Sequence, residues 1–351
     1  MVRVLHIITG LGMGGAENVL LELSKESKKR SDCNMKIFSF GYKKDLLRSF
    51  EDSGIDVEFV GSERNVSAYF NVFKRLLKKV NTDKYDVIHA HMFHSLVLCV
   101  GLKLIYPKLK VVFTAHSINL GSKFREFIVF LLRPFRSQDI VFSSDGNKFF
   151  NRADSKIVAN GIWTSKYNLN LPKFEVFTFL VIGRIEAAKN HFALLEFVKN
   201  INIKIEYQIL IAGGGANFDD LEIAIRENGL GGKIKLLGVR YDIAELCNKS
   251  HAFLLPSLWE GMPLSLLEAG ASGLPVICTP VGSIPSFISD RNGYLVSINQ
   301  FPQTMEHVIN NYDEAKTKGK MLKDDVVSNF DISTMYNDHV GLYYTLLKRM
   351  I

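Results

Sequence analysis

The chain is poor in cysteine and lacks the sequence features of disulfide-rich, membrane-spanning and secreted proteins. Its thiols are scattered and form no C-x-x-C pair: Cys33, Cys99, Cys247 and Cys278. Such thiols are typical of reduced core residues, so no disulfide framework is expected and a cytoplasmic location is favoured. No run of 18 apolar residues occurs, so no spanning helix is expected. The sequence opens on a strand pattern at residues 2–8, so no signal peptide is expected either.

The charge of the chain is unevenly distributed. Residues 1–165 carry 25 Lys and Arg against 16 Asp and Glu, a net of +9, whereas the remainder has a net charge of −2. A basic N-terminal half fits either solvated helix faces or an acidic partner, such as an anionic membrane surface, a pyrophosphate-linked lipid or nucleic acid. No nucleic-acid-binding signature accompanies it, so nucleic acid is not an expected partner.

Length and periodicity predict two domains. A chain of 351 residues that is 47% apolar can bury two ordinary cores. Short apolar runs alternate with helical patterns, which is typical of βαβ units and parallel sheets. The expected strands are 2–8, 35–40, 57–60, 86–90, 111–114, 139–143, 156–159, 176–182, 206–212, 233–236, 251–255, 275–278 and 294–296. The expected helices are 15–30, 66–81, 93–105, 122–134, 190–200, 218–228, 241–248 and 263–272. We therefore expect Rossmann-like domains at 1–165 and 166–325, followed by terminal helices over 326–351.

Two glutamates eight positions apart, Glu260 and Glu268, form the most informative pattern. They lie in PSLWEGMPLSLLEAG, residues 256–270, where Gly261 and Pro263 predict a loop that leads into a helix. The amides and positive dipole of a helix N-terminus suit a phosphate, and flanking carboxylates suit hydroxyl groups. A nucleotide sugar has phosphates between two polyols. A bare E-x7-E, however, is more often a capped amphipathic helix with surface acids.

The longer string SLWEGMPLSLLEAGASGLPVI resembles the retaining glycosyltransferases of family 4. The resemblance covers nearly the whole chain and is strongest over residues 176–300. It implies the GT-B fold, in which two doubly wound, Rossmann-like α/β domains face a central cleft and the last helix returns to the first domain. It also implies that Glu268 holds the ribose and Glu260 the hydroxyls of the transferred sugar. The Leu264 and Ser265 amides are the expected phosphate donors.

A glycine-rich segment, GLGMGGAE at residues 10–17, follows the first strand. It satisfies G-x-G-x-x-G, but the next strand ends without the acid that would hold the ribose of NAD. A glycine-rich loop before a helix still suits phosphate or close approach of a ligand. The GGAE form resembles the first-domain loop of the family, which implies that Gly14 and Gly15 adjoin the donor diphosphate.

Histidines end two strands of the first half. His89, His91 and His94 are spaced for zinc, but no Cys or acidic fourth ligand is near, so no metal site is expected. The family resemblance implies that His89 and His91 line the acceptor pocket, and a structural role is an equal alternative. His116 follows another strand, where ligands gather in open α/β sheets. It matches the T-x-H pattern of the family, which implies that it reaches a hydroxyl of the transferred sugar or the reacting centre.

Two cations follow the first strand of the second half. Arg184 and Lys189 can both reach a diphosphate, and fixed cations stabilise the charge of a departing nucleoside diphosphate. The resemblance assigns them that role, and it places backbone groups of Val239 or Arg240 against the nucleobase. No D-x-D, the pair that holds a metal in other transferases, occurs in the chain. We therefore expect no cofactor and no metal.

Taken together, these features predict a retaining, metal-independent glycosyltransferase. It would move a hexose from a nucleotide-diphosphate sugar, with UDP as the favoured nucleotide, to a glycan or lipid-linked glycan, as in cell-surface polysaccharide synthesis. The basic aromatic segment 123–136 predicts either a buried helix or peripheral contact with an anionic membrane. The alternatives are a nucleotide-sugar epimerase on the same architecture and a non-catalytic sugar- or nucleotide-binding module.

Overall fold

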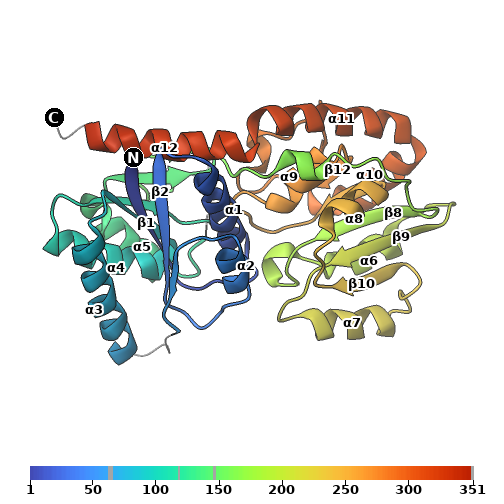
Figure 1. Ribbon diagram of the computed structural model, residues 1–351. Helices are drawn as coiled ribbons and strands as arrows, with labels where there is room; N and C mark the ends of the chain where they lie inside the picture. Colours follow the sequence, from blue (N-terminus) through green and yellow to red (C-terminus); the bar gives the residue numbers. More distant parts are fainter. Residues whose placement is uncertain (62–65, 118, 145–147, 349–351) are drawn as a thin grey trace. The chain divides into compact units, whose positions relative to one another are not determined.

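The chain folds into two compact units. The computed structural model describes residues 1–61, 66–117, 119–144 and 148–348. Unit 1 comprises Met1–Gly161 together with Ile332–Ile351, and unit 2 comprises Ile162–Asp331. Each unit is built on one parallel sheet (Figure 1). The divisions fall at 161/162 and 331/332, a few residues from the expected 165/166 and 325/326.

Unit 1 contains a seven-stranded sheet in the order β3-β2-β1-β4-β5-β6-β7. Its strands are β1 (Val2–Ile8), β2 (Cys33–Ser39), β3 (Val57–Phe59), β4 (Val87–His91), β5 (Lys110–Thr114), β6 (Gln138–Val141) and β7 (Lys156–Ile157). Its helices are α1 (Gly15–Lys29), α2 (Leu47–Asp52), α3 (Val66–Asp83), α4 (Met92–Ile105), α5 (Lys123–Leu131), the short η1 (Arg133–Phe135) and α12 (Ile332–Lys348). Apolar residues of α3, α4 and α5 cover one face of the sheet. Helices α1 and α2 pack a second apolar cluster, and α12 contacts α1 and β1.

Unit 2 contains a six-stranded sheet in the order β10-β9-β8-β11-β12-β13. Its strands are β8 (Phe177–Ile182), β9 (Tyr207–Ala212), β10 (Ile234–Gly238), β11 (Ala252–Leu255), β12 (Val276–Cys278) and β13 (Tyr294–Leu295). Its helices are α6 (Ala193–Asn200), α7 (Phe218–Glu227), α8 (Ile243–Lys249), α9 (Leu264–Ala271), α10 (Phe301–Asn310) and α11 (Tyr312–Asn329). Short 3-10 turns are η2 (Thr164–Tyr167), η3 (Ala187–Lys189), η4 (Ile284–Ser286) and η5 (Ile298–Gln300).

The predicted fold class is confirmed: both units are doubly wound α/β units in which every strand pair is parallel. All thirteen expected strands are present; β1 has the expected ends, and the others are shifted at one or both ends. Helices α2, α10 and α11 were not predicted. The buried stripe of α11 consists of Ala315, Gly319, Leu322 and Val326, and two of these four are too small to mark a hydrophobic face. The Gly270 position of α9 faces Leu322 and Val326 of that stripe.

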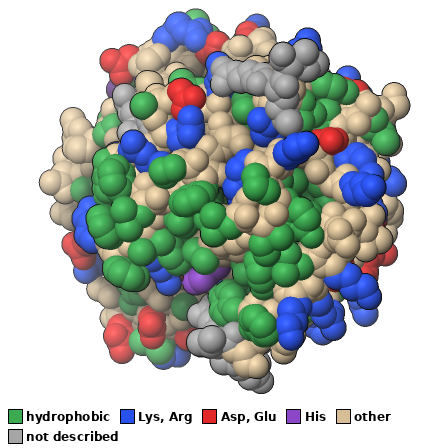
Figure 2. Space-filling view, turned by 90° about the vertical axis from the view of Figure 1, so that its left-hand side faces the viewer, with side chains coloured by type: hydrophobic (Ala, Val, Ile, Leu, Met, Phe, Trp, Pro, Cys, Tyr) green, Lys and Arg blue, Asp and Glu red, His purple; other side chains and the backbone are tan. Residues whose placement is uncertain are grey.

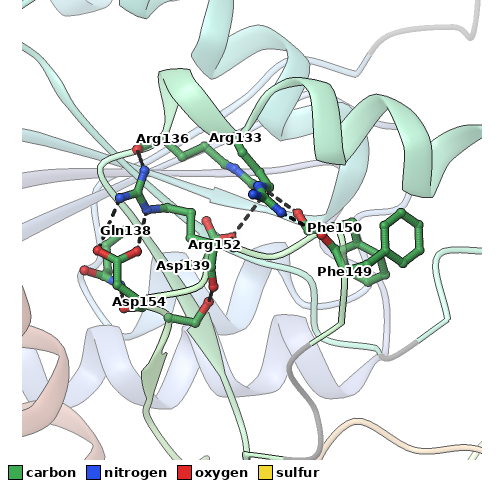
Figure 3. A network of polar contacts seen from close by, with 9 residues as sticks. Arg133, Arg136, Gln138, Asp139, Phe149, Phe150, Arg152 and Asp154 are labelled. Carbon is green, nitrogen blue, oxygen red and sulfur yellow. Dashed lines mark hydrogen bonds and ion pairs between the residues drawn. The ribbon is translucent and has the colours of Figure 1, made fainter.

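A buried ion pair joins the end of η1 to β6 in unit 1. Arg136 Nη1 lies 3.1 Å from Asp139 Oδ2, and both side chains are fully buried. The backbone N–H of Arg152 also donates to Asp139 Oδ2, while Arg136 donates to the Phe150 carbonyl (Figure 3). Burial raises the pKa of Asp139 to about 6 and lowers the pKa of Arg136 to about 10. The charges therefore depend on each other in an environment that disfavours both.

Among the described residues, no helix has the length and apolar character needed to cross a bilayer.

Candidate functional site

The residues expected to bind the donor follow neighbouring strands of the unit 2 sheet. The strand order reverses between β8 and β11, and in open α/β sheets ligands bind at the carboxyl ends of strands near such a point. The two loops that leave these strands are joined directly, because the Leu258 N–H donates to the Ala188 carbonyl at 2.8 Å. The fold therefore brings segments 183–190 and 256–264 to one edge of the sheet.

Lys189 and Glu260 meet at this edge. Lys189 Nζ lies 2.6 Å from Glu260 Oε1, and the Ser257 hydroxyl donates to the same oxygen at 2.6 Å. Their side chains are only 21% and 10% exposed, so the pair is more firmly held than an ordinary surface ion pair. Both of these hydrogen bonds are made to Oε1 of Glu260. The arrangement places a fixed cation and a carboxylate side by side, as a ligand with both phosphate and hydroxyl groups requires.

Two glycines are required for the close approach of the loops around this pair. At Gly213, a Cβ would lie 1.9 Å from the Gly183 carbonyl oxygen. At Gly282, where φ is +62°, a Cβ would lie 2.4 Å from the Glu260 carbonyl oxygen. A larger residue at either position would displace a backbone segment that carries a candidate site residue.

Helix α9 supplies the expected anion site and the second glutamate. Leu264 and Ser265 are its first residues after Pro263, so their amides occupy positions without an intrahelical acceptor. Glu268 lies one turn further along and is partly exposed. Its Oε1 accepts a hydrogen bond from the Tyr167 hydroxyl at 2.9 Å, which orients the carboxylate.

Three other expected residues of unit 2 lie at the same ends of strands. The half-exposed Arg184 pairs with Glu186 at 2.9 Å. Arg240 follows β10 and binds Asp242 through two guanidinium nitrogens. Val239 is half exposed, and its side chain lies close to Gly214 in the loop after β9. The structure therefore pairs Lys189 with Glu260, and it pairs the two arginines with acids beside them.

In unit 1, the glycine-rich loop leads into α1. Gly14 is its N-cap residue, with extended φ and ψ, and Gly15 is the first helical residue. A Cβ at Gly14 would meet only the Glu17 carboxylate, and a Cβ at Gly15 would meet nothing within 4 Å. Neither backbone conformation nor packing requires glycine at Gly15, so its lack of a side chain leaves open space.

The three expected histidines of unit 1 form a connected group. His116 follows β5 with φ +61°, a left-handed conformation that is uncommon for a non-glycine residue, and it is partly exposed. Its Nε2 lies 2.8 Å from Nδ1 of His91. His89 and His91 are buried, and the nitrogens of His89 contact Thr114 and Tyr343 hydroxyls, both at 2.8 Å. Both rings are therefore hydrogen-bonded to groups inside unit 1. The contact with an acceptor that was predicted for His89 and His91 stays a prediction.

Two family models match the chain in tandem. The model described as "Glycosyltransferase Family 4" matches residues 13–161, and the model "Glycosyl transferases group 1" matches residues 169–322. The first match lies in unit 1 and the second in unit 2. The chain is a family 4 glycosyltransferase.

Curated relatives and solved structures of similar fold extend along most of the chain. An Escherichia coli enzyme named UDP-Gal:alpha-D-GlcNAc-diphosphoundecaprenol alpha-1,3-galactosyltransferase is 25% identical over 81% of this chain and 80% of its own length. A Campylobacter jejuni alpha-1,4-N-acetyl-D-galactosaminyltransferase, named for a PP-undecaprenol substrate, is 25% identical over 77% of each chain. The crystal structure of Anabaena HepE in complex with UDP and glucose aligns with a TM-score of 0.86 at 18% identity, over 98% of this chain and all of HepE. The shared fold is GT-B.

Several partners of the candidate residues in this glycosyltransferase were not predicted. Ser257, three residues before Glu260, could have been suspected from its place in the same loop. Tyr167 and His6 had no sequence signal, because they reach Glu268 and His91 from segments 101 and 85 residues away. His94 does not join the other histidines; its ring packs near Tyr69 and Phe93 instead.

The open space at Gly15 gives a prediction for this family 4 enzyme. Gly15→Ala is expected to leave the stability of unit 1 unchanged or raised, because helical glycine costs about 0.5–1 kcal/mol relative to alanine. Transfer of sugar is expected to fall about tenfold or more, because the methyl group would occupy the room left for a ligand. Thermal unfolding and steady-state kinetics measure the two effects.

Gly341→Ala is the matched control, because Gly341 lies in α12 and its Cβ position is also open. This substitution should leave transfer unchanged. Full activity of Gly15→Ala would contradict a ligand at this position.

Proposed function

We propose that this glycosyltransferase moves a hexose from a UDP-sugar to a lipid-linked glycan with retention of the anomeric configuration and without a metal ion. The observation that carries the proposal is the Lys189–Glu260 contact at the switch point of the unit 2 sheet. It sets a phosphate-binding cation beside a hydroxyl-binding carboxylate, next to the N-terminus of α9. The UDP and glucose bound by HepE, and the polyprenyl-linked substrates in the names of the relatives, support the donor and acceptor classes.

The proposal assigns the donor groups to separate parts of the site. The Glu268 carboxylate binds the ribose hydroxyls and Glu260 binds the hexose hydroxyls. The phosphates are bound by Arg184, Lys189 and the first amides of α9. These cations take the charge-neutralising role that a metal plays elsewhere, because negative charge grows on the β-phosphate as the glycosidic bond breaks. The backbone at Val239 and Arg240 meets the base.

In unit 1, Gly14 and Gly15 contact the diphosphate, and His116 contacts the transferred sugar. The acceptor hydroxyl attacks on the face from which the diphosphate leaves, and the departing phosphate accepts its proton. This route needs no carboxylate nucleophile. The configuration of the product, read from the anomeric coupling in its proton NMR spectrum, tests retention.

Donor binding tests the proposal directly. Thermal unfolding would be measured in EDTA with UDP-, GDP-, ADP- and CMP-sugars and with NAD, for the wild type and for Glu268→Ala. A ligand at 100 times its Kd stabilises by about 2.7 kcal/mol, so UDP-sugars should raise Tm by several degrees in the wild type and much less in the variant. Stabilisation by NAD alone would contradict the proposal.

Glu196→Ala is the matched control for donor binding. Glu196 is an exposed glutamate of α6 that pairs with Lys199, and its removal should leave the UDP-sugar shift intact. Incubation of the UDP-sugar without acceptor, followed by NMR, separates transfer from epimerisation. An altered sugar in that sample would identify the epimerase alternative.

We further propose that helix α5 contacts an anionic membrane, because its apolar residues face outward. Phe124 and Phe127 are 71% and 52% exposed, and Phe130 and Leu131 are also exposed. On the inner side, Val129 is fully buried. Figure 2 shows one face of the molecule, on which hydrophobic side chains gather in patches edged by Lys and Arg. A helix with outward aromatics and basic neighbours is suited to lie at an anionic bilayer surface.

Cations border the exposed rings of α5. The Arg133 guanidinium lies 4.7 Å from the Phe130 ring centroid and donates to the Phe149 carbonyl. Lys123 begins the helix with a side chain that is 92% exposed. Phe149, itself exposed, has its ring 6.2 Å from that of Phe130. The basic charge of residues 1–165 therefore accompanies an apolar surface, as peripheral binding requires.

Phe124→Ser/Phe127→Ser is expected to lower binding to vesicles of anionic phospholipid at least tenfold, because each inserted phenyl ring contributes about 1.5–3 kcal/mol. Folding should be unaffected, since both rings are exposed. Co-sedimentation at low and high salt measures the binding. Ile223→Ser, at an exposed position of α7 in unit 2, is the control and should bind as the wild type does. Equal binding by the double variant would remove α5 from the membrane contact.

A further inference from the structure

A row of imidazoles lies inside unit 1, on the sheet face that α12 covers. In the register of the sheet, His6 of β1 is opposite His89 of β4, and His91 is opposite Thr114 of β5. Residues two apart on a strand share a face, so these side chains point the same way. From α12, the rings of His339 and Tyr343 lie 5.9 Å and 6.0 Å from that of His89.

His6 and His91 of this row form a hydrogen-bonded chain with His116, which follows β5. His116 Nε2 lies 2.8 Å from His91 Nδ1, and His91 Nε2 lies 2.9 Å from His6 Nδ1. These are N–H···N hydrogen-bond distances, so each contact holds one proton. Both nitrogens of His91 are used, and Nδ1 of His116 is the ring nitrogen outside the chain. His116 is the partly exposed end, whereas His6 is the fully buried end.

All three rings are neutral at physiological pH. Burial, together with the neighbouring histidines, lowers the pKa of His6 and of His116 to about 3. The same causes lower the pKa of His91 well below its ordinary value. A neutral imidazole carries one N–H. The two hydrogen bonds must therefore run in the same direction along the chain, either from His116 towards His6 or from His6 towards His116.

The buried end decides the direction. Within the described part of the chain, His6 Nε2 is buried and has no hydrogen-bond partner. A proton there would be a buried donor without an acceptor, and such orphaned donors are rarer than under-satisfied acceptors. The His6 proton therefore belongs on Nδ1, where it is donated to His91 Nε2. His91 then donates from Nδ1 to His116 Nε2, which leaves the His116 proton on Nδ1.

We infer that His91 and His6 are positioning residues, which hold His116 as its Nδ1–H tautomer so that this ring donates a hydrogen bond to an oxygen of the bound sugar. The inference rests on the proposed function, since it specifies how His116 meets the donor. A ring free in water would offer either nitrogen. Here His91 and His6 keep the His116 proton on Nδ1, and the left-handed backbone at His116 fixes the position of the ring. The bound sugar therefore meets an N–H group that is already oriented.

Nitrogen NMR of protein labelled with ¹⁵N-histidine tests the inference without any ligand. In the wild type, the ring shifts of His116 should show a protonated Nδ1 and an unprotonated Nε2. Scalar couplings across the hydrogen bonds should link His116 to His91 and His91 to His6. A protonated Nε2 on His116, a doubly protonated ring, or one equivalent of metal bound at His6, His89 and His91, whose ligand atoms lie within 4.8 Å of one another, would overturn it.

Substitutions test the positioning role. His91→Phe should release the His116 tautomer and lower kcat/KM about threefold to tenfold, the value of one hydrogen bond. His6→Phe should have a smaller effect, because His91 can still keep its proton on Nδ1. His339→Phe is the control: it removes a buried imidazole from the same face but leaves the chain intact, so tautomer and kinetics should not change. An unchanged His116 spectrum in folded His91→Phe would overturn the inference.

The two readouts separate this inference from the proposed function. The NMR spectrum reports the tautomer whether or not sugar is transferred. A wild type with the Nδ1–H form but no transfer from any UDP-sugar would reject the proposed function alone. An active wild type with the Nε2–H form would reject the positioning role alone.

Discussion

Lys189→Ala is expected to lower kcat about 100-fold to 1,000-fold, the usual cost of removing one fixed group that stabilises developing charge. The Lys189 ammonium is held beside Glu260 at 2.6 Å, at the end of η3, where Asn190 turns the chain with φ +54°. Its position is therefore set before the donor binds. The effect on kcat should exceed that on KM, because charge on the β-phosphate grows as the sugar departs. Steady-state kinetics with a UDP-sugar measures both.

Lys189→Arg and Lys199→Ala complete the test. Arginine keeps the charge but replaces a compact ammonium with a planar fork, so partial activity is expected. Lys199 is an exposed lysine of α6 that pairs with Glu196, and its loss should leave kcat within twofold of the wild type, roughly the scatter of a surface substitution. If Lys189→Ala and Lys199→Ala have the same kcat, Lys189 does not stabilise the leaving group.

Asp139→Ala is expected to destabilise unit 1 by about 3–5 kcal/mol, because it leaves the buried Arg136 guanidinium without its carboxylate. The pair is fully buried, with 3.1 Å between Arg136 Nη1 and Asp139 Oδ2. Hydrogen exchange of amides in β5 and β6 reports the local free energy of opening. Exchange in unit 2 should be much less affected.

The double variant Arg136→Met/Asp139→Leu separates pairing from burial. Replacing both charges with apolar side chains is often neutral or stabilising, so most of the lost protection should return. Asp154→Ala is the control, since Asp154 belongs to the same network but is half exposed beside Arg152 (Figure 3). Its cost should stay under about 1 kcal/mol. If the double variant is as unstable as Asp139→Ala, the loss of stability in Asp139→Ala does not come from leaving Arg136 as an unpaired buried charge.

The strands and the ends at which ligands gather were predictable, because they depend on local periodicity and on the parallel alternation of elements. That Lys189 and Glu260 serve one donor was implied by the family resemblance; the structure adds that they leave adjacent strands at one edge and are in contact. The partners of these residues were not predictable. The His6–His91 contact depends on the register of β1 against β4, which apolar spacing does not encode. Likewise, Gly319 of α11 is needed because the backbone of residues 273–275, just after α9, approaches it closely, and sequence spacing does not reveal that approach.

The sequence predicted either a buried helix or a membrane-surface helix over residues 123–136, and only the structure shows which of its side chains are buried. Both a buried helix and an interfacial helix have apolar residues at helical spacing, so the sequence left the two open. The structure shows that this helix is only partly buried: Val129 points inward, while the aromatic rings at Phe124 and Phe127 are exposed. Contact with a membrane stays a prediction. Hydrophobic spacing identifies an amphipathic helix but does not identify which medium covers it.

The division of the chain has a consequence for its synthesis. Unit 1 is complete only when α12 has been made, yet all of unit 2 is translated between Gly161 and Ile332. At roughly 5–20 residues per second, the strip of β1 and β4 that α12 covers waits on the order of ten seconds or longer on the ribosome. On that strip, His6, His89 and His91 alternate with the aliphatic side chains of Val4 and Val87. Imidazoles can be hydrated while they wait, so the nascent unit exposes a more wettable strip than aliphatic side chains alone would give.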